Sequence, residues 1–118
     1  MDYSIIENED KYIHFKITGE YSLGNGKEIL ERLFDFCREG NNHKLLVDIR
    51  EKKGQIPQMD RFFLGEYIAK ISFRKHIKLA VIGKKEQINK FSEIVAQNRG
   101  AQLKIFSNMN EARKWLLT

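Results

Sequence analysis

The sequence has few of the features that mark a secreted or membrane protein. Its 118 residues include a single cysteine, Cys37, so no disulfide can form within the chain, which fits a reducing compartment. No apolar run approaches the roughly 20 residues needed to cross a bilayer, and residues 1–4 lack the basic and apolar segments of a signal peptide. We therefore expect a cytoplasmic protein without a transmembrane segment, folded as one domain over residues 1–118.

Acidic residues are outnumbered, but the excess of positive charge is dispersed. There are 21 Lys and Arg residues against 16 Asp and Glu residues, and the net charge is +5. The local excesses fall at residues 50–53, 74–78 and 84–85. Nucleic acid or an anionic membrane surface would attract such a charge, but the two signs are interleaved along most of the chain, and no strand combines aromatic with basic residues for stacking RNA bases. We expect a solvated, mixed surface without a specific nucleic-acid site, and peripheral membrane contact stays open.

Residues typical of metal sites and catalysis are also scarce. The three histidines are His14, His43 and His76. No two of them have the i, i+4 spacing of a helical metal site, and only one cysteine could join them. Cys37 falls among apolar positions of a predicted helix, which favours a buried thiol over a reactive one. Because the chain shows no Ser-His-Asp or paired-carboxylate pattern, we assign no catalytic residue, metal or cofactor and predict a protein that is not an enzyme.

Hydrophobic periodicity alternates along the chain between the patterns of strands and helices. Period-two alternation or short apolar runs predict strands over residues 3–7, 11–18, 44–49, 77–82 and 101–106. Helical spacing predicts helices over residues 27–39, 59–72 and 85–98, and a last one after Asn108. The resulting order of elements is ββαβαβαβα.

This order predicts an α/β fold with a largely parallel sheet. Single helices between strands imply right-handed crossovers, whereas the short polar turn after residue 7 makes the first two strands an antiparallel hairpin. Leu45, Leu46 and Val47 follow one another without alternation, as expected of a central parallel strand that is covered on both faces.

Four strings carry a resemblance to a known family. They are LLVDI at residues 45–49, LAVIG at 79–83, LKIF at 103–106 and EARKWL at 111–116. Together with the order of elements, these strings resemble the SpoIIAA-like family, which is related in fold to STAS domains and to CRAL-TRIO lipid-binding domains. The resemblance spans nearly the whole chain. It implies a STAS-like domain with a non-catalytic regulatory role and a protein partner.

The resemblance does not extend to the phosphorylation switch of STAS antagonists of anti-sigma factors. Those proteins carry a phosphorylatable serine just after an aspartate at the start of the second helix. Here Asp60 matches the aspartate, but Arg61 and Phe62 stand where the serine would be, and no Ser or Thr occurs in residues 23–71. A phosphoswitch needs a hydroxyl to receive the phosphate, so we do not expect that mechanism in this chain.

The helix predicted over residues 59–72 has more apolar surface than contact with a sheet requires. One apolar stripe is enough to cover a sheet. A second stripe begins beside it, and such a stripe marks either an interface or packing beneath a loop. With the matching aspartate, the candidate partner-binding residues are Met59, Asp60, Phe62, Ala69 and Phe73. They support the leading hypothesis, a module that binds a protein partner or a second copy of itself.

A second group of candidates lies where the parallel strands end. Ligands of open α/β sheets bind outside the carboxyl ends of the strands, and the loops there would bring together Gly24, Gly26, Asp48, Arg50 and Lys84. These charges suit a polar or anionic ligand, although exposed loops are commonly charged and a turn with a helix cap also accounts for the glycines.

Two alternative functions would use these loops. One is a carrier of a small ligand or lipid with a CRAL-TRIO-like fold, which requires a pocket of roughly 300 Å³ or more. That pocket would open beside the second or third helix and would be apolar. The other is an enzyme for an anionic substrate, which would need a pair of titratable groups converging at the strand ends.

Overall fold

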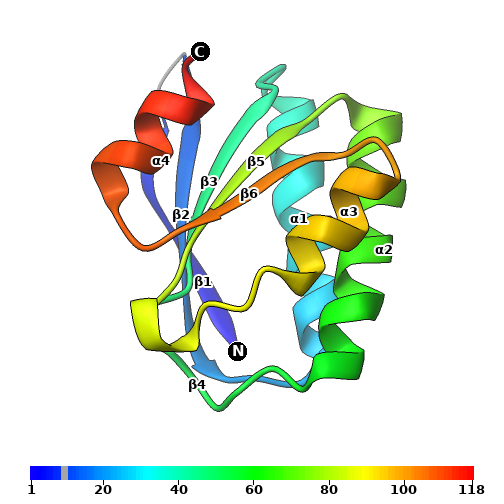
Figure 1. Cartoon of the computed structure of the whole chain (residues 1–118). Helices are drawn as coiled ribbons and strands as arrows, with labels where there is room; N and C mark the ends of the chain where they lie inside the picture. Colours follow the sequence, from blue (N-terminus) through cyan, green and yellow to red (C-terminus); the bar gives the residue numbers. More distant parts are fainter. Residues whose placement is uncertain (9–10) are drawn as a thin grey trace.

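The computed structural model describes residues 1–8 and 11–118, leaving aside the side chains of Asn8 and of residues 73–75. Its strands are β1 (Asp2–Asn8), β2 (Ile13–Glu20), β3 (Lys44–Asp48), β4 (Lys52–Lys53), β5 (Lys78–Ile82) and β6 (Gln102–Phe106). Its helices are α1 (Leu23–Glu39), α2 (Gln58–Lys75), the short 3-10 helix η1 (Lys85–Gln87), α3 (Phe91–Asn98) and α4 (Met109–Leu116). Figure 1 shows one sheet with α1, α2 and α3 on one face and α4 on the other.

The sheet confirms the predicted α/β class. Its strand order is β1-β2-β3-β5-β6, and the short strand β4 pairs with the end of β2. Strand β1 runs antiparallel to β2, whereas the pairs β2–β3, β3–β5 and β5–β6 are parallel. The parallel strands therefore end at the same edge of the sheet, the lower edge in Figure 1. We refer to it as the carboxyl edge.

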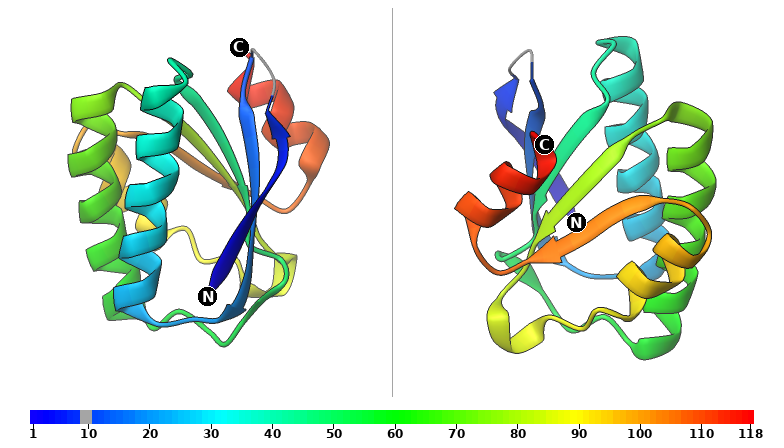
Figure 2. Two further views of the ribbon diagram at one scale, coloured as in Figure 1. Left: turned by 180° about the vertical axis from the view of Figure 1, so that it is seen from behind. Right: turned by 45° about the horizontal axis from the view of Figure 1, so that its top comes forward.

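Two apolar layers hold the sheet between the helices. On the side of α1 and α2, Phe15, Leu33 and Phe34 are fully buried. Figure 2 shows α1 and α2 running side by side across this face. On the side of α4, Leu46 and Leu116 are fully buried. The central strand β3 is thus covered on both faces, which explains its apolar run without alternation.

Helix α1 begins earlier than the sequence predicted, at Leu23 instead of residue 27. Its N-cap is Ser22, whose side-chain oxygen accepts a hydrogen bond from the backbone N–H of Asn25 at 3.3 Å. The glycines that were assigned to a loop therefore lie in the first turn of the helix. Gly26 lies close to Tyr21 in this turn, because a Cβ at this position would lie 3.3 Å from Cε1 of Tyr21 and the ring would have to shift.

The third predicted helix is interrupted. The spacing predicted one helix over residues 85–98, but η1 and α3 are separated by Ile88, whose backbone is extended (φ −70°, ψ 125°). The side-chain oxygen of Asn89 accepts a hydrogen bond from the backbone N–H of Phe91 at 2.9 Å and satisfies a free donor at the start of α3. Residues 83–90 therefore form an irregular connection along the carboxyl edge (Figure 1).

Strand β4 was not predicted. It pairs in parallel with the end of β2, with Gly19 opposite Lys52 and Glu20 opposite Lys53. Two residues are too few to give a periodic pattern in the sequence. The pairing fixes Lys52, which is only 7% exposed, at the carboxyl edge of the sheet.

Helix α2 has two apolar stripes because it packs on two sides. One stripe contributes Ile68 to the buried cluster beneath the sheet. The other meets α3, where the ring of Phe62 lies 6.3 Å from that of Phe91. Gly65 permits the closest approach of the two helices, since its neighbours across the contact are the backbone of Ser92 and the side chain of Val95. In the second stripe, the chain itself therefore covers Ala69 and part of Phe62, whereas Met59 is exposed.

Replacing Gly65 with alanine is expected to destabilise the domain. A Cβ at Gly65 would lie 2.8 Å from the carbonyl oxygen of Ser92 and 2.9 Å from Cβ of Val95, so α2 and α3 must move apart. We expect the free energy of unfolding, measured by urea denaturation, to fall by about 1–3 kcal/mol.

Gly24→Ala is the matched control for this substitution. Gly24 lies in α1, and a Cβ there would have nothing within 4 Å. The control should leave stability unchanged or raise it by up to about 1 kcal/mol, because alanine favours a helix. Equal effects of the two substitutions would contradict the tight contact between α2 and α3.

Candidate functional site

A cavity of about 430 Å³ opens at the carboxyl edge of the sheet. It lies between the ends of the parallel strands and the first halves of α1 and α2, and it is bordered by the loop that carries β4 and by residues 83–89. Its volume falls within the roughly 300–1,000 Å³ of small-molecule sites. The opening lies beside α2, where a ligand carrier was expected to have its pocket.

The walls of the cavity are mainly apolar. The strand ends and the two helices contribute Ile17, Leu30, Val47, Ile68, Val81 and Leu103. Leu30 and Val81 pack against the core and yet remain only partly buried. Apolar surface left accessible in a concave site is the surface that an apolar ligand would remove from water.

Three basic side chains among the lining residues form what we term the basic cluster, which consists of Lys52, Arg61 and Lys84. Lys52 is buried, and its ammonium donates to the backbone carbonyl of Gly54. Burial lowers the pKa of Lys52, and the positive charges of Arg61 and Lys84 lower it further. Among the described lining residues the one acidic side chain is Glu86, which is exposed. The basic cluster therefore lacks a buried counter-charge.

Arg61 ties together two segments that border the cavity. Its Nε donates to the carbonyl oxygen of Ile56 at 3.1 Å, on the loop before α2. Its Nη1 and Nη2 donate to the carbonyl oxygens of Asn89 and Gln87, each at 3.4 Å. Burial lowers the pKa of this guanidinium. Arg61 thus positions the irregular connection between β5 and α3 while it adds charge to the site.

Tyr21 joins the cavity to the start of α2. It lines the cavity, and its hydroxyl donates to Oδ2 of Asp60 at 3.1 Å. Burial raises the pKa of Tyr21, and the hydrogen bond to Asp60 raises it further, so the hydroxyl stays protonated. The carboxylate that the sequence offered as a partner contact is thereby engaged within the fold.

The other candidate partner-binding residues are exposed to different extents. Met59 is 63% exposed, whereas Phe62 is half-buried against α3. Ala69 is 4% exposed and lies one turn beyond Gly65, so little of its side chain is open to a partner. The side chain of Phe73 lies outside the described residues.

The candidate ligand-binding residues separate into two groups. Gly26 and Lys84 line the cavity, but Gly24 does not. Asp48 and Arg50 also lie outside the cavity and bind each other, with the guanidinium of Arg50 donating to the carboxylate at 3.0 and 2.8 Å. Burial acts to raise the pKa of Asp48, but the hydrogen bonds from Arg50 hold it below its usual range. Each charge of this ion pair is therefore balanced by the other within the fold.

Sequence reasoning did not single out Lys52 or Arg61. Each is one of many basic residues in a polar stretch, and no local pattern distinguishes it from its neighbours. Their burial arises from β4 and from the irregular connection after β5, which are tertiary features. The periodicity of the sequence carries no signal for either feature.

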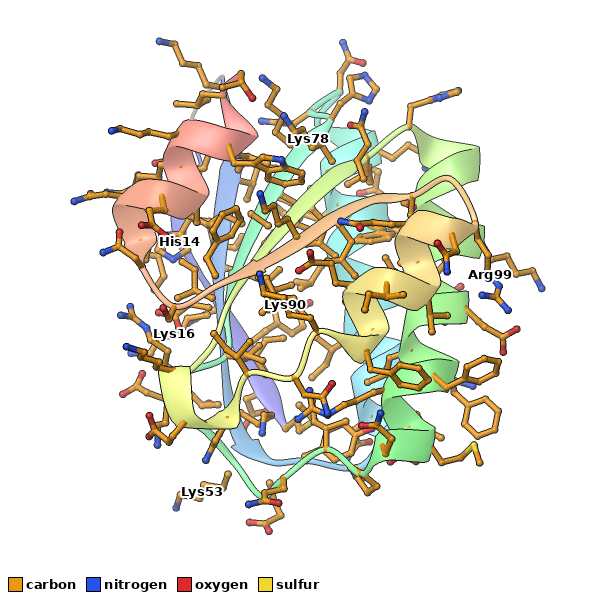
Figure 3. All side chains as sticks on the ribbon, viewed as in Figure 1. His14, Lys16, Lys53, Lys78, Lys90 and Arg99 are labelled. Atoms are coloured by element: carbon orange, nitrogen blue, oxygen red, sulfur yellow. The ribbon has the colours of Figure 1, made fainter. Side chains whose placement is uncertain are left out.

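A second group of titratable side chains lies on the opposite face of the sheet. Figure 3 shows His14 on the side of α4, away from α1 and α2. His14 is 5% exposed, and within the described part of the chain neither ring nitrogen has a hydrogen-bond partner. Glu7 is the central acid of the group, because it accepts hydrogen bonds from Tyr12 and from Arg113, both at 3.2 Å. Burial lowers the pKa of His14, although Glu7 acts to raise it.

Residues 1–8 and 11–118 contain neither a metal-binding group nor a helix that could span a membrane. No three side chains of His, Cys, Asp or Glu in these ranges come together to hold a metal ion. No helix in the same ranges is both long enough and apolar enough to cross a bilayer. Cys37 is fully buried, and burial raises the pKa of its thiol to about 12, so it is not a reactive nucleophile.

The fold and the matching segments define the class of protein. One sheet with an antiparallel first strand and alternating parallel strands and helices is the architecture of STAS-type domains, as the sequence predicted. The SpoIIAA-like family model matches residues 12–117, and the chain belongs to this family. Comparison with curated protein sequences gives no match.

Two solved structures share the fold. An anti-sigma factor antagonist from Mycobacterium paratuberculosis is 10% identical and superposes with a TM-score of 0.59, covering 99% of this chain and 96% of the antagonist. An uncharacterised protein of the DUF3478 family from Shewanella loihica PV-4, which has a SpoIIAA-like fold, is 22% identical with a TM-score of 0.56, covering 98% of this chain and 92% of that protein. At these identities the likeness establishes the fold alone.

The burial of His14 predicts a dependence of stability on pH. Below about pH 6.5, the ordinary pKa of histidine, the unfolded chain takes up a proton that the buried ring resists. The free energy of unfolding should therefore fall between pH 7 and pH 5, by at most about 1.4 kcal/mol per pH unit for this group. His14→Gln cannot titrate and should show a smaller fall in urea denaturation.

The exposed His43 provides the matched control. His43→Gln changes the same residue type at the surface, so it should keep the pH dependence of the unmodified protein. If His14→Gln and His43→Gln respond to pH alike, burial of His14 does not contribute to acid sensitivity.

Proposed function

We propose that this chain is a non-catalytic STAS-type binding module that holds a small, largely apolar molecule in the cavity at the carboxyl edge. The observation that supports this most directly is the open volume of about 430 Å³ bounded by apolar side chains. Each methylene group that such a ligand buries contributes about 0.8 kcal/mol. The position also agrees with the general rule that ligands of open α/β sheets bind outside the carboxyl ends of the strands.

The lining hydroxyl groups support binding over catalysis. The hydroxyl of Tyr21 is held protonated by Asp60, and the hydroxyl of Ser92 donates to the backbone carbonyl of Arg61 at 2.8 Å. Tyr21 donates to a carboxylate, but its raised pKa opposes loss of the proton, and Ser92 donates to a backbone carbonyl, which cannot take the proton as an activated nucleophile requires. The Tyr21–Asp60 pair binds the proton more firmly in the folded chain, which is the opposite of activation.

The start of α2 serves the cavity in this proposal. In STAS antagonists the corresponding segment carries a phosphorylatable serine, whereas this chain has Arg61 there, with three of its donors on backbone carbonyls around the cavity. In this proposal, a ligand that shifts residues 83–90 changes the conformation at the start of α2 through the hydrogen bonds of Arg61. The conformational change is then triggered by ligand binding and not by phosphorylation.

Filling the cavity tests the proposal. Val81→Trp should place a large ring in the empty volume beside β5, where the native side chain is only partly buried. We expect the neutral fluorescent probe N-phenyl-1-naphthylamine to bind the unmodified protein at one site, and to bind Val81→Trp at least tenfold more weakly. Fluorescence titration measures both affinities, and circular dichroism verifies that the variant is folded.

Val81→Ile is the matched control, because it adds one methylene group and leaves most of the cavity open. It should retain probe binding. Unchanged binding by Val81→Trp, or no binding by the unmodified protein, would contradict a ligand site in this cavity.

A protein partner is the second candidate function, and exposed apolar side chains at the start of α2 favour it. Met59 is 63% exposed and Phe63 is 39% exposed, on the same helix that borders the cavity. One protein of the same fold is described as an anti-sigma factor antagonist, which is consistent with a protein partner for this chain. We place the partner surface at Met59 and Phe63, next to the ligand site, with self-association as one form of it.

A charged residue at Met59 tests this surface. Met59→Glu should weaken self-association at least tenfold in sedimentation equilibrium without lowering the unfolding midpoint, because the native side chain is mostly exposed. Ile94→Glu is a control on α3, where the native side chain is 52% exposed. A monomer at all concentrations, or an equal effect of both variants, would contradict self-association through the start of α2.

A further inference from the structure

We infer that the molecule held in the cavity carries a single acidic head group, which the basic cluster binds while the apolar walls hold the rest of the ligand. This inference rests on the proposed function and adds the chemical class of the ligand. The apolar volume alone does not explain why three basic side chains border the cavity. The specificity residue is Lys52, with Arg61 and Lys84 adding positive charge.

The first support is the imbalance of charge around Lys52. A buried ammonium is ordinarily paired with a carboxylate, because removing it from water is costly. Lys52 is 7% exposed and forms no ion pair with a described residue, and its neighbouring charges are the two other cations of the cluster. An anion at this position would supply the missing counter-charge and reduce the repulsion within the cluster.

The second support is the availability of donors. An ammonium group has three N–H donors, and the structure gives Lys52 one acceptor, the carbonyl oxygen of Gly54. Lys84 is exposed and has no hydrogen-bond or ion-pair partner among the described residues. Arg61 is committed to three backbone carbonyls, so it contributes mainly through its charge. Lys52 and Lys84 can therefore bind the oxygens of an acid directly.

The third support is the separation of the two kinds of surface. The cluster comes from the β4 loop, the start of α2 and the connection after β5, which border the cavity. Leu30, Ile68 and Leu103 come from the interior of α1, α2 and β6 and form apolar wall. A ligand with an acid at one end and an apolar body matches this arrangement, whereas a wholly apolar ligand would leave the buried Lys52 without a counter-charge.

Competition between an acid and the alcohol of the same chain length tests the inference. Decanoate, decyl phosphate and decanol are titrated against N-phenyl-1-naphthylamine bound to the unmodified protein at constant ionic strength. We expect at least one of the acids to displace the probe at a concentration at least tenfold lower than decanol. The stronger of the two acids identifies the head group as a carboxylate or a phosphate.

Lys52→Met and Lys53→Met form a matched pair for this experiment. The two lysines are adjacent and each substitution removes one positive charge, but Lys52 is buried at the cavity whereas Lys53 is exposed and projects from the lower edge of the molecule (Figure 3). Lys52→Met should lose the preference for the acid over decanol, with each displacement referred to the affinity of that variant for the probe. Lys53→Met should keep the preference.

The outcomes separate this inference from the function on which it rests. Displacement by decanol as readily as by both acids, or a preference that survives in Lys52→Met, would overturn the acidic head group and leave the cavity as a site for apolar ligands. Failure of all three compounds to displace a bound probe would overturn it as well. Failure of the probe itself to bind would overturn the proposed function together with this inference.

Discussion

The close contact between α2 and α3 is the constraint on which the cavity depends. Gly65 allows the backbone of Ser92 and the side chain of Val95 to approach α2, and the hydroxyl of Ser92 donates to the carbonyl of Arg61 at 2.8 Å. Helix α3 packs mainly on α2 and has only eight residues. It therefore leaves the ends of the parallel strands partly uncovered, and an irregular connection has to cross the carboxyl edge.

Charge is distributed unevenly around this opening. The interior of the domain is apolar on both faces of the sheet, whereas the basic cluster lies at the carboxyl edge, on β4, the start of α2 and the connection after β5. The buried carboxylate of Asp48 is balanced by the guanidinium of Arg50. Lys52, by contrast, lies beside other cations. A site that keeps unbalanced charge sacrifices stability, and such a cost is typical of functional sites that await a ligand of opposite charge.

Much of the fold could be predicted from the sequence because its signals are local. The apolar run of β3 and the helical spacing of α2 gave the class, the order of elements and the parallel sheet. The predicted boundaries of two helices were wrong for physical reasons. The glycines of α1 indicated a loop, although Ser22 caps a helix that contains them. Ile88 continued the helical spacing of the sequence, although its backbone is extended and a new helix begins at Phe91, where the side chain of Asn89 accepts a backbone hydrogen bond.

The site could be predicted only in outline. The expectation that a ligand would lie at the carboxyl edge depends on topology. Two of the residues expected there, Gly26 and Lys84, line the cavity. The burial of Lys52 depends on a strand of two residues, and the role of Arg61 depends on carbonyls 26 and 28 residues away in sequence. Neither could be inferred from periodicity. The second stripe of α2 was ambiguous for the same reason, since only the structure shows that Phe62 packs against Phe91 of α3 while Met59 stays exposed.

A crystal structure of the protein with decanoate would test the central claim most directly. The account predicts electron density for one molecule in the cavity, with its carboxylate within hydrogen-bond distance of Lys52 and its chain along Leu30 and Leu103. The contact of α2 with α3 at Gly65 would be retained. Decanoate bound only elsewhere on the surface, or a cavity closed by movement of α3 against the strand ends, would contradict the account.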